Sequence, residues 1–290
     1  MAFSINPSSL FNAVIEKAPY YNDEEQQQDA PEFMMFILDQ LHEEMKHIPP
    51  RSFNTDFNHL SDNASAAESW AMNNLNFNNS IIYETFYGQQ QFKIVCSSCD
   101  NASITFEPFL FLSLPWPQNR RTQDSHKKNK HIQLTDCLSS FFQNEEEWFC
   151  SHCRAVTKST IRRWLSKPPE VLSLQLIRSN NVGKKINALV EFPLSGLEMA
   201  PYCSDAVLKS SITTYDLYAV INHKKLSFDL AHFTAITRRP CISDTKNSVV
   251  NWRLFDDEEV FNVKEDQVCR KKAYLLMYHR RRTPAGHTLS

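Results

Sequence analysis

Alternating apolar and polar residues predict a group of β-strands in the C-terminal half of the chain. Residues 215–223 (YDLYAVINH) and 232–239 (HFTAITRR) alternate and are rich in aromatic and β-branched types, which favour half-buried strands. Residues 252–255 (WRLF) lead directly into Asp256 and Asp257. We expect two strands, with His232 at the entrance of the second, and a third strand that ends on the two carboxylates. Such a histidine and carboxylate can form a general base and the group that orients it. A surface histidine beside a solvated acidic turn is the alternative.

Helical periodicity dominates the N-terminal part instead. Residues 8–17 (SSLFNAVIEK) predict a short helix, and apolar residues recur at helical spacing from Met34 to Met45. Asp29 and Glu32 have the spacing of a capping box, and Pro31 falls in the first helical turn. We therefore expect a helix from Asp29 to about Lys46, ended by the two prolines at 49–50.

The middle of the chain predicts further strands and loops. Strands are expected over 78–99, 103–117, 161–165, 171–178 and 273–281, with a short helix over 134–143 capped by Thr135 or Asp136. Residues 51–70 are rich in Asn, Ser and Ala and predict an exposed loop. Residues 118–131 are basic and polar without interleaved aromatics, which favours a solvated insertion over a binding patch.

Composition places the chain among soluble globular proteins. Apolar residues make up 42% of the 290 residues and the formal net charge is −2, so no bulk attraction to nucleic acid is expected. No apolar run approaches the length of a bilayer span, and the N-terminus lacks the pattern of a signal peptide. We therefore expect no membrane partner and a cytoplasmic or nuclear location. Only 4 glycines occur, where average usage would supply about 20.

Two Cys-x-x-Cys pairs are the strongest local chemical signal. Cys96 and Cys99 form the first pair, and Cys150 and Cys153 form the second. Two hairpin turns with this spacing can place four thiolates around one ion, and four soft ligands without an open position suit structural zinc. A disulfide or redox role is less favoured, because no βαβ pattern surrounds either pair. The remaining cysteines have no metal-ligand spacing and are interpreted as ordinary thiols: Cys137, Cys203, Cys241 and Cys269.

Several of these segments resemble the ubiquitin-specific proteases, the papain-like deubiquitinating enzymes. The histidine box of that family combines a Tyr-x-Leu-x-Ala-Val strand ending in His, then Gly-Gly-His-Tyr, then Trp-x-x-Phe-Asp-Asp and a valine. The matching residues here are Tyr215, Leu217, Ala219, Val220, His223, His232, Phe233, Trp252, Phe255, Asp256, Asp257 and Val260. Residues 27–33 (QQDAPEF) resemble the Gln-Gln-Asp box, and the resemblance runs in order from about residue 8 to residue 280.

The resemblance implies a fold, a partner and site residues. The expected fold is the α+β papain-like architecture, with residues 1–75 as the remnant of a helical thumb, 76–178 as zinc-bearing fingers and the start of a palm, 179–280 as the rest of the palm, and 281–290 as a basic tail. His232 would be the general base and Asp256 its orienter, with His223 as the competing base candidate. Gln28, Asp29 and Asp257 would bind the substrate, which in this family is the C-terminal tail of ubiquitin. The oligomeric state is left open.

One part of the family pattern has no match in this sequence. The family's nucleophile lies in a Gly-Leu-x-Asn-x-Gly-Asn-Thr-Cys-x-x-Asn box upstream of the Gln-Gln-Asp box, and the first cysteine here is Cys96. Leu230 and Ala231 also replace the two glycines before the catalytic histidine, and Lys224 and Lys225 replace Ser-Gly after the first histidine. Side chains larger than glycine at these positions would crowd the ubiquitin tail. This favours a catalytically inactive, ubiquitin-binding relative. An N-terminally incomplete copy of an active hydrolase is the first alternative, and a zinc-ribbon scaffold or interaction protein is the second.

Overall fold

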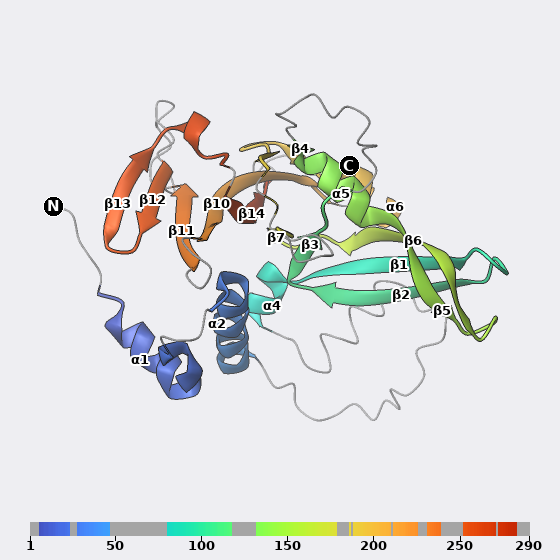
Figure 1. The fold of residues 1–290 in the computed structure, drawn as a ribbon, viewed down its shortest axis with the longest axis horizontal. Coiled ribbons are helices and arrows are strands. Elements are labelled where there is room, and N and C mark those ends of the chain that lie inside the picture. The colour runs from blue at the N-terminus through green and yellow to red at the C-terminus, as the bar shows by residue number, and fades with distance from the viewer. Residues whose placement is uncertain are drawn as a thin grey trace.

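The computed structural model describes residues 6–23, 28–46, 80–117, 132–178, 186, 188–209, 211–225, 231–238, 252–270 and 272–282. Three parts are visible in Figure 1: a group of helices, a large sheet, and a narrow four-stranded sheet that projects from it. We call the large sheet the main sheet and the narrow one the finger sheet. No helix in the described part of the chain is both long enough and apolar enough to cross a bilayer.

The N-terminal helices follow the sequence pattern closely, with one correction. They are α1 (Ser8–Lys17), the 3-10 turn η1 (Pro19–Asn22), α2 (Ala30–Met45) and α4 (Ile81–Phe86). Residues 81–86 were expected to be strand, but the Ser80 hydroxyl accepts the backbone N–H of Tyr83 at 3.1 Å and caps a helix there. Ser80 also contacts Nδ1 of His42 at 2.6 Å, and this buried contact ties α4 to α2.

The finger sheet consists of two antiparallel hairpins joined side by side. Its order is β2-β1-β6-β5, with β1 at Gly88–Cys96, β2 at Ala102–Phe109, β5 at Gln143–Cys150 and β6 at Ala155–Lys167. The outer strands β2 and β5 are exposed along most of their length, so this sheet buries little apolar surface of its own. Both Cys-x-x-Cys pairs lie at the tips of the hairpins, as the spacing predicted.

The main sheet has eight strands in the order β13-β12-β11-β10-β14-β7-β3, with β9 beside β10. Their bounds are β3 Phe111–Leu114, β7 Val171–Leu176, β9 Leu197–Glu198, β10 Thr214–Lys225, β11 Ala231–Arg238, β12 Trp252–Asp256, β13 Glu259–Val263 and β14 Ala273–Arg280. Residues 103–117 were expected to be one strand. They form two instead, because β2 pairs in the finger sheet while β3 runs parallel to β7 in the main sheet.

Apolar side chains cover both faces of the main sheet. The larger core lies against α5 (Leu134–Phe142), and the smaller one lies on the face that Met34 of α2 and Phe86 of α4 contact. The N-cap of α5 is Gln133, two residues before Thr135, and the Asp136 carboxylate accepts the backbone N–H of Gln133 at 3.2 Å. The remaining short elements border the larger core: β4 (Ile132–Gln133), β8 (Val190–Glu191), η2 (Ala200–Tyr202), α6 (Asp205–Leu208) and η3 (Glu265–Gln267).

Gly88 marks the point where the chain leaves α4 and enters the finger sheet. A Cβ atom at this position would lie 2.5 Å from the ring of Phe109 and 2.9 Å from the carbonyl oxygen of Lys167. Real side chains do not approach this closely, so the base of the finger sheet requires a residue without a Cβ atom.

Candidate functional site

His232 and Asp256 meet at one end of the main sheet. Strand β11 begins just before His232, and β12 ends at Asp256; the two strands are antiparallel, so the start of one adjoins the end of the other. Nε2 of His232 lies in hydrogen-bond contact with Oδ1 of Asp256, and the imidazole is mostly buried. When Nε2 carries its proton and donates to this carboxylate, Nδ1 keeps the lone pair that can accept a proton from a nucleophile.

Asp257 lies at the turn that follows. It connects β12 to β13 with a φ of 52°, a conformation that aspartate tolerates better than most residues. Its carboxylate is 79% exposed, and Oδ2 lies 4.0 Å from Nε2 of His232. The structure therefore places Asp257 beside the histidine and open to solvent, while Asp256 makes the closer contact.

Asp29 reaches the same end of the sheet from the start of α2. Its side chain makes no capping hydrogen bond, so the predicted capping box is wrong, although the backbone of Asp29 does occupy the N-cap position. Oδ2 instead accepts the phenol hydroxyl of Tyr274, on β14, at 3.1 Å. That hydroxyl accepts Nε2 of Gln175 at 3.0 Å, and the hydroxyl of Ser113 donates to Oε1 of Gln175 at 2.9 Å. A chain of hydrogen bonds thus fixes Asp29 against three strands.

This position raises the pKa of Asp29. Burial is the largest cause, and the hydrogen bonds from Tyr274 and from the backbone of Ala30 only partly offset it. Burial and the nearby Asp29 carboxylate also raise the pKa of Tyr274. A half-buried carboxylate with a raised pKa, fixed by a hydrogen-bond chain, is typical of a functional site, because a cationic or hydrogen-bonding ligand would favour its charged form.

Aromatic contacts connect the Asp29 region with the His232 region. The ring of His223 stacks on Phe233, the residue after His232, with ring centroids 4.7 Å apart and an interplanar angle of 13°. The same imidazole lies 5.4 Å from the ring of Tyr274. His223, the competing base candidate, therefore packs between the two halves of the site. Sequence reasoning did not single out Tyr274, whose only signal was its place at the start of the predicted last strand.

Of the remaining residues predicted for this region, the structure describes the side chain of Gln28 but not those of three others. Gln28 donates from Nε2 to the backbone carbonyl of Tyr20 at 3.2 Å, which ties η1 to the start of α2. Gln27, Leu230 and the side chain of Ala231 lie outside the described residues. Their predicted roles beside the ubiquitin tail stay predictions.

The four predicted metal ligands converge at the finger tips. All four sulfur atoms of Cys96, Cys99, Cys150 and Cys153 lie within 4.8 Å of one another. Sγ of Cys96 is 3.8 Å from Sγ of Cys153, and Sγ of Cys99 is 3.7 Å from Sγ of Cys150. Sulfurs at the corners of a tetrahedron, each about 2.3 Å from a central zinc ion, are about 3.8 Å apart. The donor set and its spacing therefore fit a tetrahedral thiolate-bound ion.

Hydrogen bonds favour the thiolate form of Cys96, whereas contacts with the neighbouring thiols raise the pKa of Cys153 to about 12. The hydroxyl of Thr157 contacts Sγ of Cys96 at 3.2 Å, and together with the N–H of Ser98 it lowers the pKa of Cys96 to about 6. The backbone N–H of Cys153 donates to Sγ of Cys150 at 3.4 Å. Such N–H···S bonds favour the thiolate form that a metal requires.

The other described cysteines lie in apolar surroundings. Burial raises the pKa of Cys137 to about 11 and that of Cys203 to about 12, and it also raises the pKa of Cys269. All three pack in or against the larger core, and no described cysteine lies within hydrogen-bond distance of His232. Cys241 lies outside the described residues.

Comparisons with known proteins agree on one family. The family model of ubiquitin carboxyl-terminal hydrolase matches residues 2–278. Ubiquitin carboxyl-terminal hydrolase 2 of Gallus gallus is 31% identical over 288 residues, covering 95% of this chain and 74% of the relative. Ubiquitin carboxyl-terminal hydrolase 3 of Homo sapiens is 32% identical over 299 residues, covering 98% of this chain but only 54% of the relative.

Solved structures give the same result. A SAGA DUB module of Ubp8, Sgf11, Sus1 and Sgf73 bound to monoubiquitin contains a chain that is 25% identical, with a TM-score of 0.63 over 95% of this chain and 53% of that one. The same module bound to ubiquitin aldehyde matches with 25% identity and a TM-score of 0.63 over 97% of this chain and 56% of that one. The chain thus spans about half the length of these solved chains.

Proposed function

Since the chain belongs to the ubiquitin carboxyl-terminal hydrolase family, we propose that it recognises ubiquitin through its deubiquitinase-type domain. The predicted α+β fold of ubiquitin-specific proteases is confirmed by the likeness to the solved modules. The single observation that carries the proposal is the meeting of His232, Asp256 and Asp29 at one end of the main sheet.

In this proposal Asp29 binds the tail of ubiquitin. Its carboxylate is half-buried and is held by Tyr274, so it can accept hydrogen bonds from a docked peptide without reorganising. Asp257 is exposed next to His232 and can contact the same tail. Gln28 acts indirectly, because its hydrogen bond to Tyr20 holds the segment that leads into Asp29.

We also propose that the 290-residue chain binds ubiquitin without cleaving it. His232 and Asp256 have the arrangement of a base and its orienter, but catalysis also requires a thiolate beside the base. Four described cysteines form the metal cluster, and the thiols of Cys137, Cys203 and Cys269 have raised pKa values that disfavour the reactive form.

An active hydrolase is the second candidate. It is favoured by the intact contact between His232 and Asp256, which a protein that only binds ubiquitin does not need. In this case another polypeptide segment would supply the nucleophile, and Nδ1 of His232 would accept its proton.

Zinc is the proposed ion of the cysteine cluster, in a structural role. Cys96 and Cys99 from one hairpin and Cys150 and Cys153 from the other would hold it. When bound, the ion joins the two hairpin tips of a sheet that buries little apolar surface, and this stabilises the fingers.

Isothermal titration of the purified chain with ubiquitin tests the binding proposal. We expect saturable binding to full-length ubiquitin and weaker binding to ubiquitin without its C-terminal Gly-Gly. Asp29→Asn keeps an acceptor for Tyr274 but loses the charge, so affinity should fall about tenfold. Asp205→Asn, on the exposed start of α6, is the matched control and should bind like the parent. No saturable binding, or equal affinity of Asp29→Asn and the parent, would contradict the proposal.

A ubiquitin probe with a C-terminal electrophile separates the two catalytic alternatives. We expect no adduct with the 290-residue chain. A cysteine box from an active relative is then fused ahead of Met1, with and without Leu230→Gly and Ala231→Gly. If the two residues obstruct the ubiquitin tail, the glycine changes should raise hydrolysis by about 100-fold, because a misplacement of about 1 Å can reduce the rate that much. A fully active fusion without the glycine changes would favour the hydrolase.

A further inference from the structure

A second group of charged side chains lies at the opposite end of the main sheet from His232. Strand β10 is antiparallel to both β11 and β14, so the start of β10 adjoins the ends of the other two. A pocket of about 310 Å³ opens there. Its basic lining residues are Arg238, Arg280, Arg281 and Arg282, and His279 lies among them. Arg238 follows His232 by six residues on the same strand, which corresponds to about 20 Å.

Two of these arginines are already neutralised. Nε and Nη2 of Arg281 donate to the two carboxylate oxygens of Asp216 at 2.9 and 2.8 Å, and the backbone N–H of Gly196 donates to the same carboxylate at 2.8 Å. These contacts hold the pKa of Asp216 below its usual range. Arg280 forms an ion pair with Glu170. The carboxylates near the pocket are therefore already engaged.

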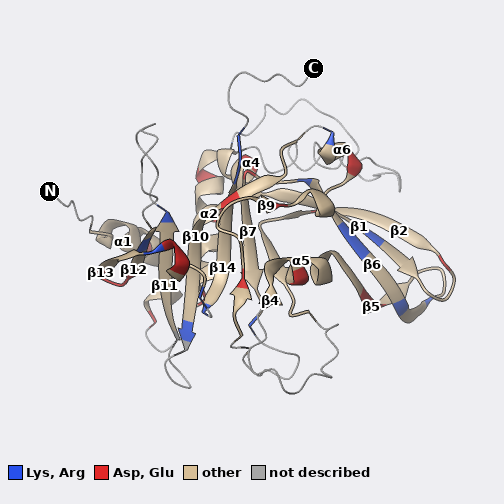
Figure 2. Ribbon diagram, turned by 90° about the horizontal axis from the view of Figure 1, so that it is seen from above, with Lys and Arg blue, Asp and Glu red and all other residues tan. Residues whose placement is uncertain are grey.

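Arg238 and Arg282 leave positive charge in excess. Both are exposed, and no carboxylate of a described residue lies within 4.0 Å of either guanidinium. A guanidinium cannot lose its proton in a protein, so this charge is permanent. In Figure 2 the ribbon of the last described residues, which follow β14, is blue. Among the described residues, the pocket thus offers two guanidiniums without an ion pair, although Arg238 lies near enough to Asp216 to help lower the pKa of that carboxyl.

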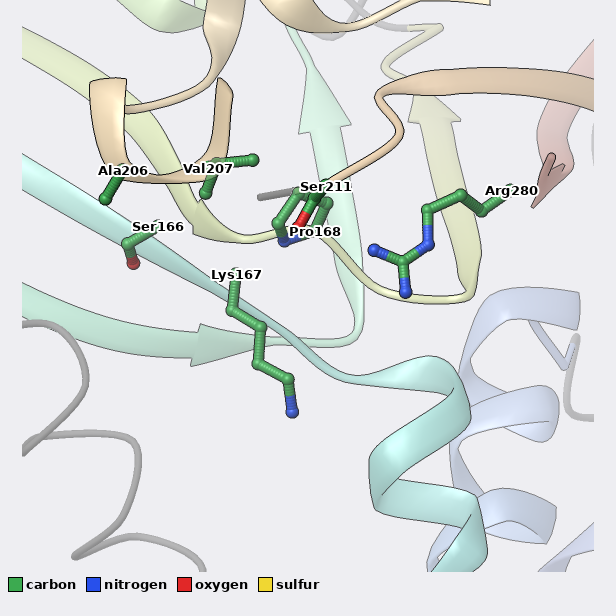
Figure 3. A pocket seen from close by; sticks show the side chains of 7 residues that line it. All are labelled: Ser166, Lys167, Pro168, Ala206, Val207, Ser211 and Arg280. Atoms are coloured by element: carbon green, nitrogen blue, oxygen red, sulfur yellow. The ribbon is translucent and has the colours of Figure 1, made fainter. Parts of the chain in front are cut away.

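The neighbouring pocket has a different charge balance. It measures about 280 Å³ and shares Arg280, which reaches toward Pro168 and Ser211 in Figure 3. Burial lowers the pKa of Lys167 in its wall to about 8, and the carboxylates of Glu84 and Glu170 lie close enough to oppose that shift. No carboxylate from the described part of the chain lines this pocket, but Glu84 and Glu170 lie close to Lys167, and Glu170 also pairs with Arg280. These nearby carboxylates compensate its two basic residues, which favours the first pocket as the anion site.

We propose that the pocket lined by Arg238 and Arg282 binds a phosphomonoester group carried on a peptide side chain. A phosphate dianion matches two unpaired guanidiniums in charge, and its oxygens accept bidentate hydrogen bonds from arginine. The volume of about 310 Å³ is at the low end of ligand pockets, which suits one small group. Nucleic acid is disfavoured, because Tyr218 is the single aromatic residue of the lining and its hydroxyl contacts the sulfur of Met277.

Fluorescence anisotropy with a labelled alanine pentapeptide that has a central phosphoserine tests the site. The parent chain should bind it at least about tenfold more tightly than the matched serine peptide, and Arg238→Gln with Arg282→Gln should remove that difference. Lys158→Gln with Arg162→Gln, two exposed residues of β6, makes the same change in net charge and should leave binding unchanged. Arg282→Gln alone, outside any strand, provides a variant whose folding is not at risk.

Three outcomes of the assays with peptides and an oligonucleotide would overturn the proposal. They are equal affinity for the two peptides, phosphopeptide binding that survives the double arginine change, and tighter binding of a single-stranded oligonucleotide than of the phosphopeptide. Inorganic phosphate should displace the phosphopeptide at higher concentration, which shows that the phosphate group itself is recognised. If inorganic phosphate binds as tightly as the phosphopeptide, the proposal that a peptide carries the phosphate group is wrong. None of these results depends on ubiquitin binding.

Discussion

Replacing Cys150 by serine should release the metal ion and loosen the finger tips without unfolding the main sheet. A serine hydroxyl keeps its proton at neutral pH and is a poor zinc ligand, so three thiolates remain. Zinc content should fall from one ion per chain to nearly none. The main sheet has its own large core and does not contact the four sulfurs, so it should stay folded.

The magnitude follows from the small apolar burial in the fingers. Structural zinc contributes about 10–16 kcal/mol in small domains at neutral pH. Strands β2 and β5 are mostly exposed, so apolar burial in the finger sheet can replace little of the free energy that zinc contributes. If only about 3 kcal/mol of local stability is lost, amide exchange at the tips accelerates by about 100-fold. The N–H groups of Ser98 and Cys153 are the most direct reporters, because each donates to a ligand sulfur at 3.4 Å.

Hydrogen exchange and metal analysis of the same samples provide the measurement. Cys269→Ser is the matched control, because it changes a thiol outside the cluster, and its hydroxyl can keep the hydrogen bond to the carbonyl of Val190. The control should retain one zinc ion and slow exchange at the tips. A parent protein purified without zinc, or a Cys150→Ser protein whose tip amides exchange as slowly as those of the parent, would refute the reasoning.

Two further changes test the base of the finger sheet. Gly88→Ala should lower the free energy of unfolding by about 1–3 kcal/mol, because the new Cβ overlaps the Phe109 ring; an unchanged urea midpoint would contradict this. Lys167→Gln should remove a pH dependence. The folded-state pKa of Lys167 is lowered from 10.5 to about 8, so the unfolded chain binds more protons between these values and stability rises with pH there. Urea midpoints at pH 8 and pH 10 should therefore differ more in the parent than in the variant. An equal difference between the two midpoints in both proteins would contradict this.

Local patterns predicted most strands of the main sheet and the hairpin turns that bring the four cysteines together. Both faces of β10 carry buried apolar side chains, Tyr215 and Leu217 in the larger core and Ala219 in the smaller one, so its aromatic and β-branched residues marked it as a strand. The Cys-x-x-Cys spacing likewise records a local turn. Both signals depend on neighbours within a few residues, and such signals are readable from one sequence.

Two of the failed predictions involve partners far apart along the chain. Asp29 has the spacing of a capping residue, yet Tyr274, 245 positions later, takes its carboxylate. Residues 103–117 were predicted as one continuous strand, but Leu110 is the point where the chain passes from the finger sheet to the main sheet. These two tertiary choices leave no mark in local periodicity. The error at residues 81–86 was local instead, because Ser80 is a favoured N-cap residue and its hydroxyl accepts the backbone N–H of Tyr83.

Because the ligands are far apart along the chain, the metal site also affects the stability of the main sheet. Cys99 and Cys150 are 51 residues apart, and the segment between them includes β3 and α5, which belong to the main sheet and its core. An ion that joins the two hairpins therefore closes a loop of the chain that contains part of the main sheet. In the chain-entropy model, a cross-link over a loop of this length removes conformations of the unfolded chain worth about 4 kcal/mol. Metal bound at the finger tips thus favours folding of a sheet that it never touches.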